Sequence, residues 1–131
     1  MIGYMTVGTN DIERARKFFD GVFGEIGGKR GWDAERMTGW TNGKSPTQVM
    51  VIKPYNEEAA TVGNGSMVAL AMTSPDDVKK VHAKAMALGG KDEGAPGFRP
   101  AEANSGFYGG YFRDLDGNKF VAFCMVPKKQ N

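Results

Sequence analysis

The chain has 131 residues, which suits one compact domain with a sizeable buried core. It carries 17 Lys and Arg against 15 Asp and Glu, and this small net charge of +2, without a basic stripe, does not favour nucleic acid as a partner. The opening residues lack a signal-peptide pattern, no apolar run reaches the roughly 18 residues of a membrane span, and the single cysteine, Cys124, cannot form an intramolecular disulfide. We therefore expect a cytoplasmic protein without a membrane partner.

The first half of the chain predicts a strand, a helix and three more strands. YMTV at residues 4–7 is typical of a short strand, Asn10 is a candidate N-cap, and DIERARKFFDGVFG has apolar residues at helical spacing. A Gly-Gly-Lys follows, and glycine suits the backbone just after a helix. The strands expected after it are 29–32, 36–40 and 48–53.

The same order of elements recurs in the second half. MVALAMTSP predicts a strand, Ser74 with Pro75 predicts the start of a helix, and DDVKKVHAKAMALGG continues that helix to a second Gly-Gly-Lys. A short piece near Lys91 and strands at 107–113 and 118–126 complete the half, with Asp116-Gly117 as the turn of a hairpin. Sliding the first helix onto the second superimposes their apolar faces and places Tyr4 on Met67.

This repeat predicts an α+β fold in which residues 1–131 form one domain. Two β-α-β-β-β modules, at about 1–54 and 66–127, are joined by a polar, glycine-bearing linker at 55–65. Because one module buries too little alone, we expect the two to share a core and to form a curved, partly closed mixed sheet around a central cleft. The alternative is an ordinary α+β sandwich in which the repeat is accidental.

Three segments also carry a resemblance to a known superfamily. They are GYMTVGTNDIERARKFFDGVFG, GNGSMVALAMTSPDDVKKVHAKAMALGGKDEGAPGFRP and FYGGYFRDLDGNK. In order and spacing they resemble the vicinal oxygen chelate superfamily of glyoxalases, bleomycin resistance proteins and extradiol dioxygenases, and RDLDGNK is similar to the family's Asp-Pro-Asp-Gly-Asn turn, with Leu115 in place of proline. The resemblance implies the glyoxalase fold and usually a homodimer. In metal-dependent members it implies one divalent ion held by residues on the first and last strand of each module.

Carried over to this chain, those ligand positions fall on Tyr4, Gln48, Met67 and Val121. Only the Gln48 amide offers an oxygen suited to a hard divalent cation, because a thioether prefers soft metals, valine has no donor, and a tyrosine would have to ionise. The single histidine, His82, falls on the second helix, away from the cleft. We therefore expect no metal and no other cofactor.

Without a metal, the residues expected in the cleft are mainly apolar and aromatic, which suits a small aromatic or hydrophobic ligand held by stacking and dispersion. The same side chains would alternatively fill the sheet and leave no cavity. The irregular segment GAPGFRPAEANSG, residues 94–106, is interpreted as a binding loop, and its arginine either pairs with an anionic ligand group or is simply solvated. The candidate ligand-binding residues are Tyr4, Trp40, Gln48, Met50, Met67, Arg99, Phe107, Tyr111, Val121 and Phe123.

Catalytic candidates are few. No Ser-His-Asp, Cys-His or paired-carboxylate arrangement falls in the expected cleft, and Tyr4 is its one proton donor. We interpret the chain as a metal-free, dimeric binding protein of the glyoxalase and bleomycin resistance type. The alternatives are a lyase, isomerase or dioxygenase of the same superfamily with a non-standard site, or a module that binds a protein partner through the dimer edge.

Overall fold

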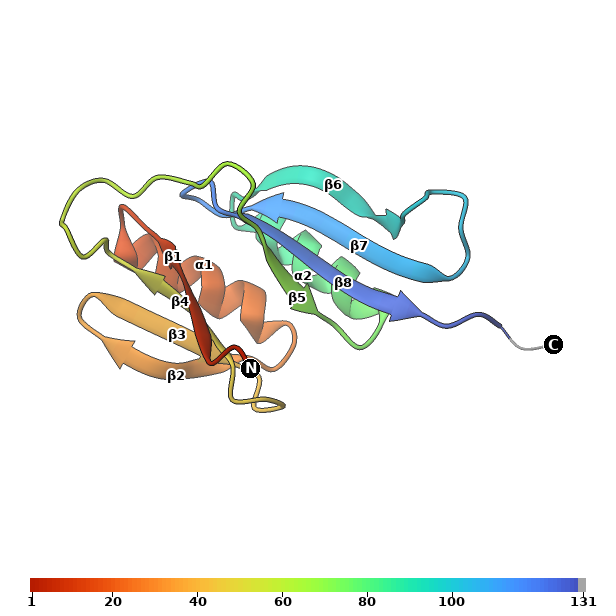
Figure 1. Cartoon of the computed structure of the whole chain (residues 1–131), viewed down its shortest axis with the longest axis horizontal. Helices are drawn as coiled ribbons and strands as arrows, with labels where there is room; N and C mark the ends of the chain where they lie inside the picture. Colours follow the sequence, from red (N-terminus) through yellow and green to blue (C-terminus); the bar gives the residue numbers. More distant parts are fainter. Residues whose placement is uncertain (130–131) are drawn as a thin grey trace.

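The computed structural model describes residues 1–129 as two halves, each with the element order β-α-β-β-β (Figure 1). The elements are β1 (Tyr4–Gly8), α1 (Ile12–Gly24), β2 (Lys29–Ala34), β3 (Met37–Thr41), β4 (Gln48–Ile52), β5 (Val68–Ala71), α2 (Pro75–Ala87), β6 (Lys91–Phe98), β7 (Gly106–Arg113) and β8 (Lys119–Val126). Within this part of the chain, neither helix has the length and apolar character needed to cross a membrane.

The strands form two four-stranded mixed sheets, one in each half. Their orders are β1-β4-β3-β2 and β5-β8-β7-β6. In each sheet the first and last strands of the half run parallel and the other pairs run antiparallel. The predicted α+β fold class is therefore confirmed. The two sheets lie side by side with both helices behind them, and they are not closed on each other (Figure 1).

The helix starts follow from their caps. Asp11, rather than the predicted Asn10, is the N-cap of α1, because the Asn10 side chain is already engaged in two hydrogen bonds with the backbone of Ala60 in the segment between the halves. The Asp11 carboxylate accepts a hydrogen bond from a first-turn amide at 3.1 Å. In α2 the predicted start is confirmed, with Ser74 as N-cap and Pro75 at the first helical position.

Strand β6 is longer than the sequence predicts. Its residues include Gly94, Pro96 and Gly97, which read as loop signals, yet the strand continues through them to Phe98. Two register shifts against β7, one before and one after Gly94, absorb the irregular residues, and proline is tolerated because β6 is the edge strand. Only residues 99–105 of the predicted binding loop therefore lie outside the strands.

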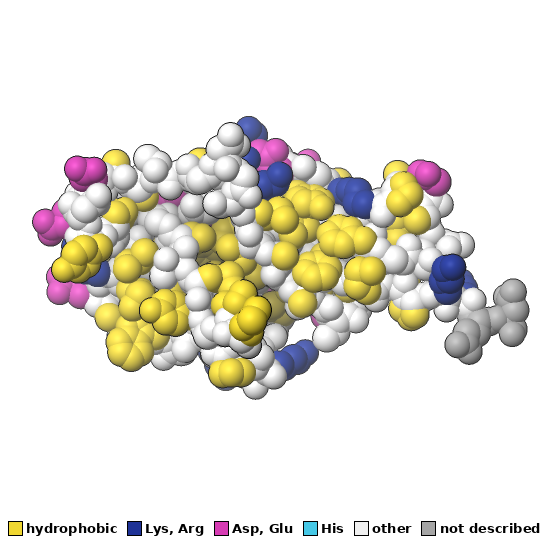
Figure 2. Space-filling model, viewed as in Figure 1, with side chains coloured by type: hydrophobic (Ala, Val, Ile, Leu, Met, Phe, Trp, Pro, Cys, Tyr) yellow, Lys and Arg dark blue, Asp and Glu magenta, His cyan; other side chains and the backbone are white. Residues whose placement is uncertain are grey.

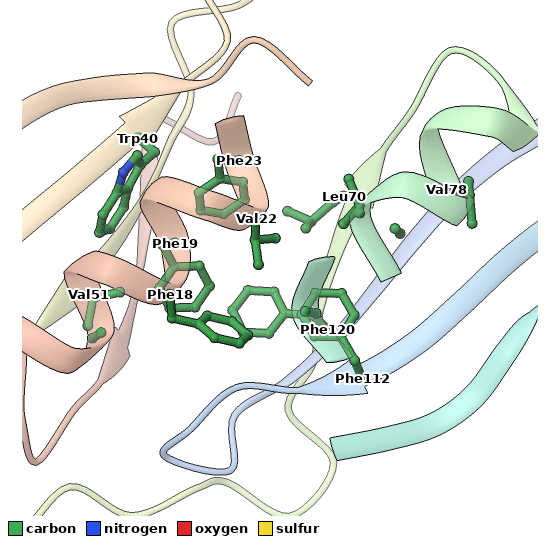
Figure 3. Close-up of a cluster of buried hydrophobic side chains, with 14 of the residues drawn as sticks. Phe18, Phe19, Val22, Phe23, Trp40, Val51, Leu70, Val78, Phe112 and Phe120 are labelled. Carbon is green, nitrogen blue, oxygen red and sulfur yellow. The ribbon is translucent and has the colours of Figure 1, made fainter. Parts of the chain in front are cut away.

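One hydrophobic core spans both halves (Figure 3). The ring of Phe19 on α1 lies 5.5 Å from Trp40 on β3 and 5.4 Å from Phe120 on β8, measured between ring centroids. Phe120 in turn stacks on Phe112 of β7 at 5.5 Å. Large buried aromatic side chains contribute much of a small core's stability. This row of four rings therefore joins the N-terminal sheet to the C-terminal sheet through α1.

The turn between β7 and β8 also connects the halves. The Asn118 side chain donates a hydrogen bond from Nδ2 to the carbonyl oxygen of Gly8 at 2.9 Å. Oδ1 of Asp116 accepts from the backbone amide of Asn10 at 2.9 Å and from the guanidinium of Arg14 at 3.0 Å. The family-like DLDGN turn thus holds the end of β1 and the start of α1 against the second half.

Candidate functional site

Each sheet has one face covered by its helix and one face turned away, which we call the open face. Val51, Phe120 and Cys124 belong to the core on the helix side, so the residues alternating with them point to the open face. Hydrophobic side chains gather over both sheets in the view onto these faces, with charged side chains mainly at the margins (Figure 2). The open-face residues used below are Tyr4, Thr6, Gln48 and Met50 in the first half, and Ala69, Phe107, Tyr111, Lys119, Val121 and Phe123 in the second.

Most of the predicted ligand-binding residues lie on this side of the molecule. Arg99 reaches it by lying over the ring of Tyr111, with Cζ 5.6 Å from the ring centroid. Met67 directly precedes β5 and lines a hollow of about 110 Å³ together with Thr6 and Lys119. Because Thr6 is in the first half and Lys119 in the second, the two open faces meet at this hollow.

Trp40 is the exception: it lies on the helix side of its sheet and, instead of the open face, lines an apolar crevice of about 250 Å³ between the two halves. It is 2% exposed on the helix side of the sheet, where its indole nitrogen donates a hydrogen bond to Asp20 at 2.9 Å. Burial opposes ionisation of Asp20, yet hydrogen bonds from Arg30 and Trp40 hold the pKa of that carboxyl below its ordinary value. Side chains alternate along β3, so Gly39 occupies the neighbouring open-face position.

The strand register changes one assignment in the expected metal site. Thr6 of β1 pairs with Met50 of β4, and Ala69 of β5 pairs with Val121 of β8. Because the repeat that carries Tyr4 to Met67 also carries Thr6 to Ala69, Met50 is the counterpart of Val121. Gln48 lies two residues earlier than that position.

The resulting donor set does not fit a divalent ion. The four positions become Tyr4, Met50, Met67 and Val121: one phenol, two thioethers and a hydrocarbon, none of them a ligand that hard divalent cations prefer. Elsewhere in residues 1–129, no group of three or more His, Cys, Asp or Glu side chains is arranged to hold a metal. The family's metal chemistry therefore has no ligand set in the described chain.

Gln48 presents a hydrogen-bond donor rather than an oxygen ligand. Its Oε1 atom accepts a hydrogen bond from the backbone amide of Trp32 at 3.1 Å. To reach β2 the side chain crosses Gly39 and Gly31, where an added Cβ would lie only 2.6 Å and 2.8 Å from Oε1. Since the oxygen is engaged, the Nε2 amide hydrogens are the part of Gln48 left to meet a ligand.

The second sheet carries a stacked pair of aromatic side chains, Phe107 and Phe123, which we call the aromatic wall. The rings of Phe107 and Phe123 stack with centroids 5.4 Å apart and planes 7° apart. Gly109 makes room for this arrangement, because a Cβ there would lie 2.6 Å from the Phe107 ring and 3.3 Å from Val121. Val121, at the position where the family resemblance places a metal ligand on the last strand, is therefore closely packed among apolar side chains and only 1% exposed.

One end of the aromatic wall is cationic. Nζ of Lys119 lies 5.6 Å from the centroid of the same Tyr111 ring that Arg99 covers. The neighbouring acid, Glu93, accepts a hydrogen bond from Arg113 at 2.8 Å, and this bond holds the pKa of Glu93 below its ordinary value. Sequence reasoning missed Lys119, although its position two residues before Val121 places it on the same face of the strand.

A crevice of about 250 Å³ separates the facing edges of β1 and β5. Its walls include Met5, Phe23, Val49 and Leu70, and polar residues of the β3–β4 loop stand at its mouth. His82 is not near it: the ring Nε2 lies 3.0 Å from Asp92 and 3.2 Å from a β7 carbonyl, so the histidine links α2 to the second sheet. The crevice is thus apolar and free of acid–base groups of the usual catalytic kind.

Comparisons with known proteins establish the family. The model of the Glyoxalase/Bleomycin resistance protein/Dioxygenase superfamily matches residues 1–122, so the chain belongs to this superfamily. A glyoxalase/bleomycin resistance protein from Albidiferax ferrireducens has a similar structure, with a TM-score of 0.84, 34% identity, and coverage of 95% of this chain and 98% of the other.

More distant structures share the fold alone. Fosfomycin resistance protein FosX from Mesorhizobium loti has a TM-score of 0.68 at 21% identity, covering 96% of this chain and 92% of its own. Lactoylglutathione lyase from Agrobacterium tumefaciens has a TM-score of 0.67 at 16% identity, covering 95% and 92%. Comparison with curated protein sequences gave no match.

Proposed function

We propose that this chain is a metal-free binding protein for a small aromatic or hydrophobic molecule and that it acts as a cytoplasmic homodimer. The observation that carries the proposal is the stacked pair Phe107 and Phe123 on an open face whose family ligand positions hold no ligand that hard divalent cations prefer. A flat ligand can stack on this wall, while Gln48 Nε2 supplies a hydrogen bond that sets its orientation.

The crevice between the two halves supports the same proposal. Its volume of about 250 Å³ is close to the lower end, about 300 Å³, of typical small-molecule pockets, and its lining is mostly apolar. The enzymatic alternatives have no comparable support. Tyr4 is 62% exposed, and within residues 1–129 its hydroxyl has no hydrogen-bonded base to activate it.

The binding test is a thermal-shift titration with flat aromatic compounds such as 2-naphthol. A ligand that binds the native state at 100 times its Kd adds about 2.7 kcal/mol of stability, so the wild-type Tm should rise with concentration. Phe123→Leu should reduce that rise, whereas Tyr55→Leu, at a 97% exposed position in the segment between the halves, should not. The absence of stabilisation by any aromatic compound, or an undiminished rise in Phe123→Leu, would count against the proposal.

The metal-free part is tested separately. The protein is incubated with nickel, zinc, manganese or iron, desalted, and analysed for bound metal. We expect well below one equivalent per chain, because Met50 and Val121 replace the expected last-strand ligands. One retained equivalent would contradict the proposal.

The homodimer is proposed because large apolar side chains are exposed on the open side. Tyr4 is 62% exposed, Met67 45% and Met125 65%, and a soluble monomer rarely leaves a wide apolar face uncovered. A second copy would cover about 800 Å² on each chain in a stable dimer and would shield the aromatic walls from water. Light scattering should give a dimer mass that Met125→Glu lowers and Tyr55→Glu does not. A monomeric wild type at micromolar concentration would refute this part.

A further inference from the structure

Arg99 is held in place by the chain around it. Its Nη2 donates a hydrogen bond to the carbonyl oxygen of Ala95 at 2.9 Å, and Nη1 donates to that of Phe98 at 3.2 Å. The guanidinium lies against Gly94 and Gly97, where an added Cβ would come within 3.1 Å and 3.3 Å of its nitrogens. Two of its five N–H groups are used by these carbonyls, so a fixed fork of donors remains for another group.

Lys119 adds a second positive charge at the same ring. Arg99 and Lys119 each lie 5.6 Å from the Tyr111 centroid, and neither forms an ion pair in the described part of the chain. The nearby carboxylate of Glu93 is hydrogen-bonded to Arg113 instead. The charge of Lys119 also acts on Glu93, but among residues 1–129 no carboxylate lies within ion-pair distance of either cation beside the Tyr111 ring.

We propose that Arg99 and Lys119 bind the anionic group of the ligand, so that the ligand is a flat apolar molecule bearing a carboxylate or a similar acid. This inference rests on the proposed binding function and specifies its ligand class. Tyr111 lies on the same face as Phe107 and Phe123, so an aromatic body can rest on the wall while its acid reaches the cations. A guanidinium fork matches the two oxygens of a carboxylate, and the bond is charge-assisted.

The test compares two probes with the same ring system, 2-naphthoate and the neutral 2-naphthalenemethanol, by calorimetric titration of the full chain. We expect 2-naphthoate to bind about tenfold tighter, the size of one charge-assisted hydrogen bond. The double variant Arg99→Gln/Lys119→Gln should lose this preference and keep its affinity for the alcohol. Lys79→Gln/Lys80→Gln, which removes two exposed charges from α2, is the matched control and should keep the preference.

Charge reversal provides a gain-of-function arm. Arg99→Glu/Lys119→Glu should prefer 2-naphthylmethylammonium over 2-naphthoate, and unchanged melting curves establish that the variants fold. Equal wild-type affinity for acid and alcohol, or a preference that survives in Arg99→Gln/Lys119→Gln, would refute the anion site and leave the binding function standing. Failure of both naphthyl probes to bind would refute the binding function, and the inference with it.

Discussion

The shared core makes a strong prediction about Phe120. This side chain is fully buried, and replacing a buried phenylalanine by alanine costs about 3–5 kcal/mol in lost transfer free energy and cavity formation. The Phe120 ring also contacts Phe19 across the boundary between the halves at 5.4 Å. Because a small domain has a total stability of about 5–15 kcal/mol, Phe120→Ala should remove a large fraction of it.

The assay measures the unfolding of the first half, although the substitution lies in the second. Trp40 is buried in the first half, so its fluorescence during urea unfolding, in a Trp32→Phe background, reports on that half alone. If the halves form one core, Phe120→Ala moves the Trp40 transition and the far-UV circular dichroism transition together to lower urea. Val62→Ala, at a 45% exposed position, should change stability by less than about 0.5 kcal/mol. A Trp40 transition that stays at the wild-type urea concentration would show that the halves unfold independently and would refute the shared core.

Two further predictions concern the first half of the chain. Gly39→Ala should lower the free energy of unfolding in urea by about 1–3 kcal/mol, because the new Cβ displaces the Gln48 amide and crowds its neighbours. Gly24→Ala is the control and should not destabilise the protein, since no atom lies within 4 Å of its new Cβ. Equal effects of the two substitutions would contradict the packing of Gln48 over β3. The pKa of Asp20 is lowered from 3.8 in the folded state, so its contribution to stability is fully present above that value and is lost as the pH falls through the folded pKa. Wild type should therefore lose stability more steeply below pH 3.8 than Asp20→Asn does, and parallel acid limbs would contradict this.

The helices and the order of helices and strands along the chain could be predicted from the sequence because their signals are local. Apolar spacing defines both helices, and the Ser74-Pro75 start of α2 is a strong cap signal. Element ends were less predictable. Asn10 and Asp11 are both good N-cap residues, and the distant contact of Asn10 with Ala60 decides between them. Likewise, β6 continues through Gly94 because pairing with β7 overrides its loop-like composition.

The candidate site was less predictable because the sequence does not determine which face of the sheet a residue points to, nor which residues pair between strands. Gly39 and Trp40 are neighbours in β3 and therefore point to opposite faces of the sheet, Gly39 to the open face and Trp40 to the core. A two-residue difference in register separates Gln48 from Met50, the true counterpart of Val121. The sequence repeat alone cannot resolve such offsets, because β4 has five residues whereas its counterpart β8 has eight.

The DLDGN turn explains how the fold is kept while the metal donors are absent. Asp114 is 6% exposed and accepts hydrogen bonds from the backbone amides of Asp116 and Asn118, which shape the turn, although burial raises the pKa of this carboxyl. Asp116 and Asn118 then bond to Asn10 and to the backbone of β1. None of these bonds involves position 121. The turn therefore joins the two halves whether the following strand carries a metal ligand or a valine, so the motif indicates the architecture and leaves the chemistry to the residues on the open face.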